Sequence, residues 1–241
     1  MLEFFYKNQL ANKYLDRPWY GYTLYQAAKL AEYLGVSDIS VIEFGVATGR
    51  GLLCIEKHIK AIQTFLKTRF HVYGFDTGGG LPKLEGYKDL AHHWTSGMFK
   101  MDIEGLQRQL SFSKLVIGNV KETVPQFFDT YRPAPIACIL FDVDLYSSTR
   151  DSLKIFDHSD PGAFLPRIRC YFDDILGNEI SLNNEFLGEK CAINEFNDAH
   201  AHIKIAPITH LQAKSFRYKW YSKCYAAHLF EHPLYEKFIT K

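Results

Sequence analysis

An apolar segment that runs directly into a glycine-rich turn places the strongest constraint on this chain. Val41 to Phe44 is apolar around one acid, Glu43, and the next seven residues are Gly45-Val46-Ala47-Thr48-Gly49-Arg50-Gly51. Glycines permit a tight turn and a close approach of the backbone to a ligand, and a following helix offers unpaired N–H groups at its first turn. The pattern therefore predicts a strand, a loop that binds a nucleotide cofactor, and a helix.

The positions of the nearby acids narrow the type of cofactor. An NAD site places its carboxylate about 20 residues after the glycine turn, whereas here Glu43 precedes the glycines and Asp76 lies 27 residues beyond Gly49. The Gly-Lys-Ser/Thr ending of a nucleoside-triphosphate loop does not occur in this turn. Two carboxylates in these places suit a cofactor that carries a ribose and a cationic amino-acid tail.

Strand-like and helix-like segments alternate through the middle of the chain. This alternation predicts an α/β fold, Rossmann-like and doubly wound, with a mostly parallel sheet and helices on both faces. At 241 residues we expect a single domain over 1–241, with an N-terminal helical arm over about 1–36. The predicted strands are 39–44, 71–75, 114–117, 135–141 and 167–172, the main predicted helices are 22–34, 51–66, 121–131 and 184–200, and two β-like segments follow at 202–210 and 223–230.

Acidic residues follow two of the central strands. Asp142 and Asp144 come directly after 135–141, and Asp173 and Asp174 come directly after 167–172. The carboxyl ends of parallel strands share one edge of the sheet, where ligands bind in such folds. Four carboxylates at one edge repel one another unless a cation lies among them, and oxygen ligands favour Mg²⁺, with Mn²⁺ or Ca²⁺ as alternatives. A single aspartate here would more simply cap a helix or a loop, but the D-x-D and D-D pairs together favour a metal or catalytic site.

The segment after the fourth predicted strand resembles a known family signature. Asp142-Val143-Asp144-Leu145-Tyr146-Ser147-Ser148-Thr149 is similar to the D-x-D-L-Y-x-S-T run of the macrocin O-methyltransferase family, metal-dependent class I enzymes that use S-adenosylmethionine (SAM) to methylate sugar hydroxyls. The segment 76–82 is similar to that family's acid-x-x-x-G-L-P loop, and 173–174 falls where the family carries its D-D pair. The resemblance covers roughly residues 40–175.

The resemblance implies a set of roles for individual residues. It implies that Asp144 is the general base and that three aspartates hold the divalent metal, namely Asp142, Asp173 and Asp174. It also implies that the cofactor site comprises Glu43, Gly45 and Gly49 at the amino-acid end of SAM, Asp76 on the ribose, Asn119 near the adenine, and Asp142. The implied reaction moves a methyl group from SAM to a hydroxyl of a saccharide or another small polar metabolite.

Two other functions stay open at this stage. A metal-dependent hydroxylase-like enzyme on the same fold would hold iron in place of Mg²⁺, as in cephalosporin hydroxylase-like proteins, although no obvious pair of histidines with one carboxylate occurs. A non-catalytic SAM-binding module would keep the fold without turnover, but buried carboxylates with no use are costly. An NAD-dependent dehydrogenase fits least, because of the glycine and acid spacing.

Composition limits the partners and the location. A formal net charge of +1 argues against a nucleic-acid partner, and no apolar run approaches the roughly 20 residues of a membrane span. The five cysteines form no C-x-x-C pair, which is typical of reduced thiols in a cytoplasmic protein. We expect a small-molecule acceptor, and the sequence leaves a homo-oligomer open.

Overall fold

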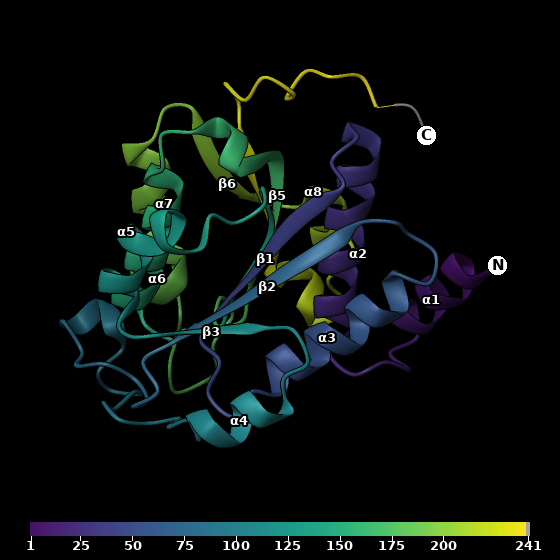
Figure 1. The fold of residues 1–241 in the computed structure, drawn as a ribbon. Coiled ribbons are helices and arrows are strands. Elements are labelled where there is room, and N and C mark those ends of the chain that lie inside the picture. The colour runs from purple at the N-terminus through teal and green to yellow at the C-terminus, as the bar shows by residue number, and fades with distance from the viewer. Residues whose placement is uncertain (240–241) are drawn as a thin grey trace.

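The structure is a computed structural model that describes residues 1–239 and contains one seven-stranded sheet. The strand order is β3-β2-β1-β4-β5-β7-β6 (Figure 1). The strands β1 to β5 run parallel, whereas β7 is antiparallel to β5 and β6 is antiparallel to β7. The predicted Rossmann-like, doubly wound fold is confirmed. The strands are β1 (Asp38–Phe44), β2 (Arg69–Asp76), β3 (Lys114–Ile117), β4 (Ile136–Phe141), β5 (Phe164–Phe172), β6 (Ile203–Pro207) and β7 (Cys224–Leu229).

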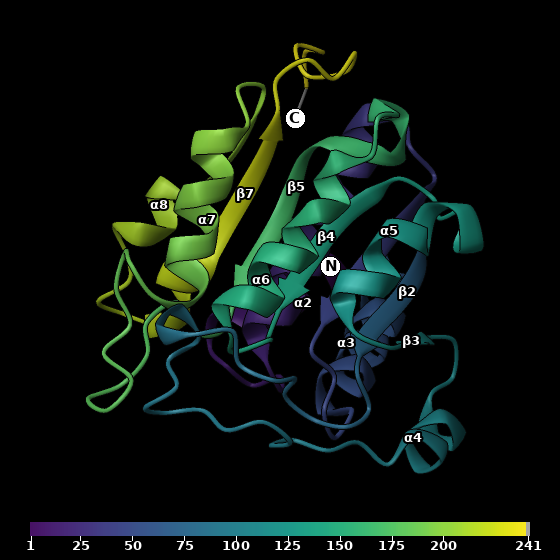
Figure 2. The same ribbon diagram turned by 90° about the vertical axis from the view of Figure 1, so that its left-hand side faces the viewer.

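Helices cover both faces of the sheet, and α5, α6 and α7 share the face seen in Figure 2. The helices α2 and α3 pack on the opposite face. None of the helices in the described part of the chain has the length and apolar character needed to cross a bilayer. The helices are α1 (Leu2–Ala11), α2 (Pro18–Leu34), α3 (Arg50–Ile62), α4 (Ile103–Gln109), α5 (Val120–Tyr131), α6 (Tyr146–Leu153), α7 (Gly188–Ala199) and α8 (Thr209–Gln212), with 3₁₀ turns at η1 (Tyr87–Asp89), η2 (Lys154–Asp157), η3 (Pro161–Ala163) and η4 (Lys219–Lys223).

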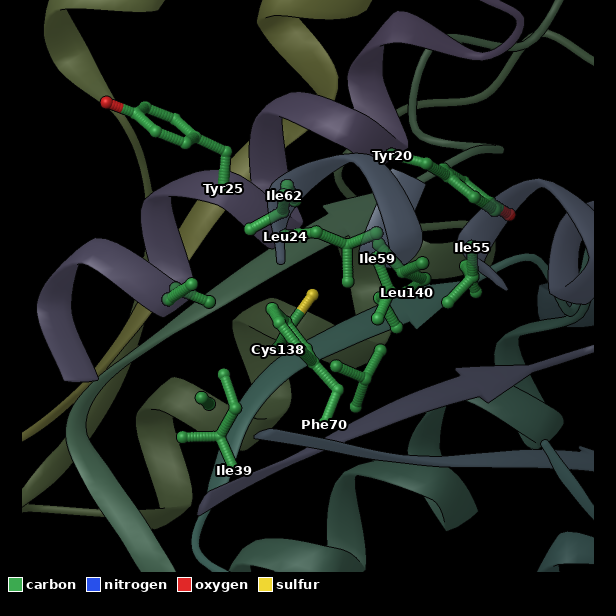
Figure 3. Close-up of a cluster of buried hydrophobic side chains, with 14 of the residues drawn as sticks. Tyr20, Leu24, Tyr25, Ile39, Ile55, Ile59, Ile62, Phe70, Cys138 and Leu140 are labelled. Atoms are coloured by element: carbon green, nitrogen blue, oxygen red, sulfur yellow. The ribbon is translucent and has the colours of Figure 1, made fainter. Parts of the chain in front are cut away.

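The sheet separates two apolar clusters. Every residue of β4 is buried, as expected for a central parallel strand with helices on both faces. Because successive side chains of a strand point to opposite faces, Leu140 packs with α2 and α3, whereas Ile139 packs with α5 to α7. Figure 3 shows the first cluster, in which Leu24 of α2 and Ile59 of α3 lie near Leu140. Both faces of the central strands therefore support the edge where the candidate site lies.

Several element boundaries differ from the sequence-based prediction. Helix α2 begins at Pro18, four residues before the predicted start, because proline suits the first position of a helix. Strand β5 begins at Phe164 and not at 167, and it includes Pro166 at a place where the pairing with β4 is irregular. Proline is tolerated there because the irregular pairing does not require its N–H. Helix α7 begins at Gly188 and not at 184.

The buried β1 position Ile42 provides a test of the core. Ile42 is fully buried, so Ile42→Ala is expected to lower the free energy of unfolding by about 2–5 kcal/mol through lost contacts and a cavity. Ile180→Ala is the matched control, because Ile180 is 66% exposed, and its effect should stay within about 0.5 kcal/mol. Urea denaturation of both variants measures the difference. Equal effects would contradict the placement of β1 in the core.

Candidate functional site

A cavity lies at the carboxyl ends of β1, β2 and β4. Its lining comes from the glycine turn after β1, from the loop after β2, from the start of α5 and from the segment after β4. Elements that are distant in the sequence meet here because parallel strands end at one edge of the sheet. The lining residues used below are Arg17, Glu43, Gly45, Gly49, Gly51, Asp76, Asn119, Asp142 and Asp144.

The conformation of the glycine turn favours residues without a side chain at positions 45 and 49. Gly45 has φ +85, and a Cβ there would lie 1.7 Å from the carbonyl oxygen of Asp142. Gly49 precedes α3 with φ +83, and its Cβ would lie 2.1 Å from Leu106. At Gly45 the positive φ and the contact with backbone admit only glycine, which allows β1 and β4 to end close together. At Gly49 the positive φ favours glycine. The exposed backbone and the first turn of α3 then line the cavity.

Asp76 holds this turn from the neighbouring strand. Its Oδ2 accepts hydrogen bonds from the backbone N–H groups of Val46 and Ala47, both at 2.9 Å, and its Oδ1 accepts one from Gly78 at 2.7 Å. The predicted contact of Asp76 with a ribose stays a prediction. The structure adds a second task for this carboxylate, because it fixes the glycine turn against its own loop.

Glu43 is a buried carboxylate with one free oxygen. The side chain is 1% exposed, and its Oε1 accepts a hydrogen bond of 2.8 Å from the Tyr20 hydroxyl. Its Oε2 is buried and has no partner among the described residues. Burial, and then the negative charge of Asp142, raise the pKa of Glu43 from 4.5 to about 8. Gly51 makes room for this group, since a Cβ there would lie 1.8 Å from Glu43 Oε1.

Asp142 and Asp144 form the wall beside the glycine turn. Asp142 faces Arg17, whose Nη1 lies 3.6 Å from the Asp142 Oδ2. Asp144 adopts φ +61, and its N–H donates to Asp174 Oδ2 at 3.1 Å. Burial raises the pKa of both Asp142 and Asp144, and the charge of nearby Asp173 raises each further. The two carboxylates predicted from the D-x-D motif therefore share one strongly negative environment.

The D-D pair continues this environment towards β5. Asp173 is partly neutralised by Lys223, whose Nζ lies 3.2 Å from its Oδ1, and it accepts a hydrogen bond of 3.0 Å from the Tyr171 hydroxyl. The N–H of Asp174 donates to Glu189 Oε2 at 2.8 Å. Burial and the neighbouring carboxylates raise the pKa of both Asp174 and Glu189. The acids predicted to share one edge of the sheet do lie together there, joined by Glu189.

The carboxylates do not form a ready metal cage. Within residues 1–239 no group of three or more acidic, histidine or cysteine side chains is arranged to hold a metal ion. The orientations explain this result, because Asp142 turns to Arg17 and Asp173 turns to Lys223. The donor set nevertheless suits a hard cation, since its charges are all carboxylates that raise one another's pKa. The metal-ligand roles of Asp142, Asp173 and Asp174 stay predictions.

Asn119 lines the cavity from the start of α5. It is the N-cap of α5, and its Oδ1 accepts a hydrogen bond of 3.0 Å from the N–H of Lys121. This cap keeps its backbone and the neighbouring Val120 in the cavity wall. A contact of Asn119 with an adenine stays a prediction.

Sequence reasoning missed several residues of the site. Arg17 precedes Pro18 at the start of α2, and only its basic charge beside a helix start offered a signal. Glu189 lies on α7 with no motif around it, and Lys223 lies on η4 near the end of the chain. Asp89 is fully buried and receives the N–H and hydroxyl of Ser147, at 2.7 and 2.9 Å. It thereby ties the loop after β2 to the start of α6.

The raised pKa of Glu43 predicts a pH-dependent stability effect. The folded chain binds the Glu43 proton more tightly than the unfolded chain does, because the pKa of Glu43 is raised in the folded state. As the pH rises from about 4.5 to about 8, ionisation of Glu43 therefore progressively lowers the free energy of unfolding. Glu43→Gln should therefore gain stability relative to the natural protein across this range. Chemical denaturation at several pH values measures the difference. Glu104→Gln is the control, because this side chain is 89% exposed, and a Glu43 effect as flat with pH as the control would contradict the burial argument.

The fold is similar to that of two solved methyltransferases. The calicheamicin methyltransferase CalS11 matches with a TM-score of 0.56 and 22% sequence identity, covering 84% of this chain and 81% of its own. The O-methyltransferase NovP matches with a TM-score of 0.52 and 19% identity, covering 74% of this chain and 71% of its own. No protein-family model and no curated protein sequence matches the chain. At these identities the similarity concerns the fold alone, a Rossmann-like α/β fold that this chain shares with both methyltransferases.

Proposed function

We propose that this chain is a SAM-dependent O-methyltransferase that methylates a hydroxyl group of a saccharide or another small polar metabolite, with help from a divalent metal. One observation carries the proposal: a single cavity is lined both by the glycine turn with Glu43 and by the aspartates Asp142 and Asp144. The first part suits a cofactor and the second suits an acceptor hydroxyl. The resemblance of 142–149 to the macrocin O-methyltransferase family supports the same reaction.

The residues of the turn fit the amino-acid end of SAM. The free Oε2 of Glu43 is a buried acceptor beside the turn, and an ammonium group would satisfy it. A cation there would also favour the ionised form of Glu43. The backbone at Gly45 and Gly49 leaves space that any Cβ would fill. When bound, SAM supplies an electrophilic methyl carbon, and the chain's part is to orient the acceptor oxygen towards it.

Asp144 is proposed to take the proton of the acceptor hydroxyl. Its pKa lies above the ordinary aspartate value because of burial and the charges of Asp142 and Asp173, so it is a better base than a solvated carboxylate. Asp142, Asp173 and Asp174 are proposed to hold the divalent metal, Mg²⁺ or another hard ion. Besides Glu43 and Asp76, five carboxylates gather beyond β4 and β5 when Glu189 is included, whereas the neighbouring cations are Arg17 and Lys223. A divalent cation would offset the remaining charge, and it would lower the pKa of a bound hydroxyl.

The activities of the two structural neighbours support this reaction. CalS11 is a calicheamicin methyltransferase and NovP is an O-methyltransferase, which supports a small-molecule acceptor for the present chain. A cytoplasmic location is part of the proposal, and it is supported by five cysteines that are all free and buried. A homo-oligomer remains compatible with it.

Calorimetric titration with SAM and with S-adenosylhomocysteine tests the cofactor assignment. We expect both to bind, and Asp76→Asn should weaken both. An amide accepts hydrogen bonds at only one oxygen, so it cannot keep the two N–H groups of the glycine turn on one atom and that of Gly78 on the other. A loss of roughly tenfold corresponds to about 1.4 kcal/mol. Asp129→Asn, at an exposed position of α5, is the control and should bind as the natural protein does. Absence of binding by the natural protein would overturn the proposal.

Asp144→Asn separates the chemical step from cofactor binding. An amide cannot accept the proton, so methyl transfer to an acceptor hydroxyl should fall by at least about 100-fold while SAM binding stays nearly unchanged. Transfer is followed with radiolabelled SAM over a panel of sugars and sugar conjugates, with Mg²⁺ and with a chelator. Turnover retained by Asp144→Asn would remove this residue as the base. Turnover that needs iron and oxygen, without methyl transfer, would favour the hydroxylase-like alternative.

A further inference from the structure

A second cavity lies on the face of the sheet that α2 covers. Its volume is about 770 Å³, and its walls come from the second half of α2, from β5, from β7, and from the β6–α8 region. The helices α2 and α8 lie on the same side of the sheet, opposite α5 to α7 (Figure 1). Arg169 lines this cavity and precedes Asp173 by four residues of β5, about 13 Å at 3.3 Å per residue. The cavity is therefore separate from the candidate methyl-transfer site.

The lysine, arginine and histidine side chains that line this cavity are all basic. Its lining contains Lys29, Arg167, Arg169, His210 and His228, and within residues 1–239 no aspartate or glutamate lines it. Lys29 has carboxylate neighbours outside the lining, on α1 and α2. The guanidinium groups of Arg167 and Arg169 have no carboxylate partner among the described residues. Basic groups that converge without a counter-ion are typical of a site for an anion.

Arg167 and Arg169 lie on the same face of β5. Side chains two residues apart on a strand point the same way and are separated by roughly 7 Å. The Nη1 of Arg167 donates to the carbonyl oxygen of Tyr235 at 3.1 Å, whereas its Nη2 is buried without a partner in the described chain. The guanidinium of Arg169 makes no hydrogen bond to a described residue and is half-buried in the cavity wall. Two forked donors are thus held side by side with donor capacity unused.

The two histidines show the effect of these cations. Burial, followed by the charge of Arg169, lowers the pKa of His210, and burial followed by Arg167 and Arg169 lowers the pKa of His228. Both imidazoles therefore lie close to the arginines. His228 is also oriented, since its Nδ1 is 2.8 Å from the Tyr235 hydroxyl. An anion between these groups would relieve the repulsion that the cations now exert on one another.

The rest of the lining suits the body of a small molecule. Leu30, Ile208, Ala226 and the ring of Tyr33 supply apolar surface around the basic groups. Ligand sites in proteins commonly enclose 300–1,000 Å³ with mostly apolar walls and a few convergent polar groups, and this cavity falls in that range. Paired arginine forks match the geometry and charge of phosphate oxygens.

We propose that this second cavity binds a phosphorylated small molecule, whose phosphate group lies between Arg167 and Arg169 and whose body packs against α2 and β7. The site is independent of the proposed methyl transfer. Its ligand would contact β5 and α2, the two elements whose other ends carry Asp173 and Arg17.

Calorimetric titration of the full chain with inorganic phosphate and with pyrophosphate tests this site. The titrations are run without divalent metal and at constant ionic strength set with chloride, so that a general charge effect stays constant. We expect saturable binding of at least one of the two anions, with one site per chain. Arg169→Gln should weaken it by roughly tenfold or more, because a charge-assisted forked contact is lost.

Arg108→Gln is the matched control, because this arginine is exposed on α4, far from the second cavity in sequence and structure. It should bind both anions as the natural protein does. Unchanged SAM binding and thermal melting of Arg169→Gln would show that this variant is folded. No saturable binding of either anion would overturn the proposal, as would binding that Arg169→Gln leaves unchanged or that Arg108→Gln weakens equally.

Discussion

The close approach of β1 and β4 at their carboxyl ends is the constraint on which the rest of the site depends. The carbonyl oxygen of Asp142 occupies the place that a side chain at position 45 would need, so the two strands can end together only because residue 45 is glycine. This contact brings the glycine turn and the D-x-D segment into one cavity. Asp76 then holds the turn from β2 through backbone hydrogen bonds. The same few backbone contacts thereby form the two parts of the cavity that are proposed to bind the cofactor and the acceptor.

Burial of negative charge is the second feature of the site. Glu43, Asp142, Asp144, Asp174 and Glu189 all have a raised pKa, and in each case burial is the largest cause. Such an arrangement is unfavourable for stability unless something cationic compensates it. Arg17 and Lys223 supply part of that compensation from α2 and from η4. The remainder of the charge is the physical reason to expect a cationic ligand at this edge.

The two cavities give β5 an unusual distribution of charge. Its carboxyl end carries Asp173 and Asp174 in an acidic environment, while Arg167 and Arg169 in its middle face a basic one. The alternation of the strand sends Ile168 and Cys170 into one apolar cluster and leaves the arginines on the side of α2. One strand therefore connects a site suited to cations with a site suited to anions.

The sequence by itself determined the fold class and the neighbourhood of the site. Apolar strands alternating with helical segments specify a parallel sheet, and an acid that directly follows such a strand must lie at its carboxyl edge, as Asp76, Asp142 and Asp173 do. The sequence predicted the ends of the helices and strands less accurately. Helix α2 begins at Pro18 and β5 includes Pro166, and both elements begin earlier than predicted. Only the tertiary structure decided which way each carboxylate turns, that Arg17 and Glu189 join the site, and that Arg167 and Arg169 share a cavity with His210 and His228. The physical reason is that these contacts join residues far apart in the chain, and no local pattern encodes the packing that brings them together.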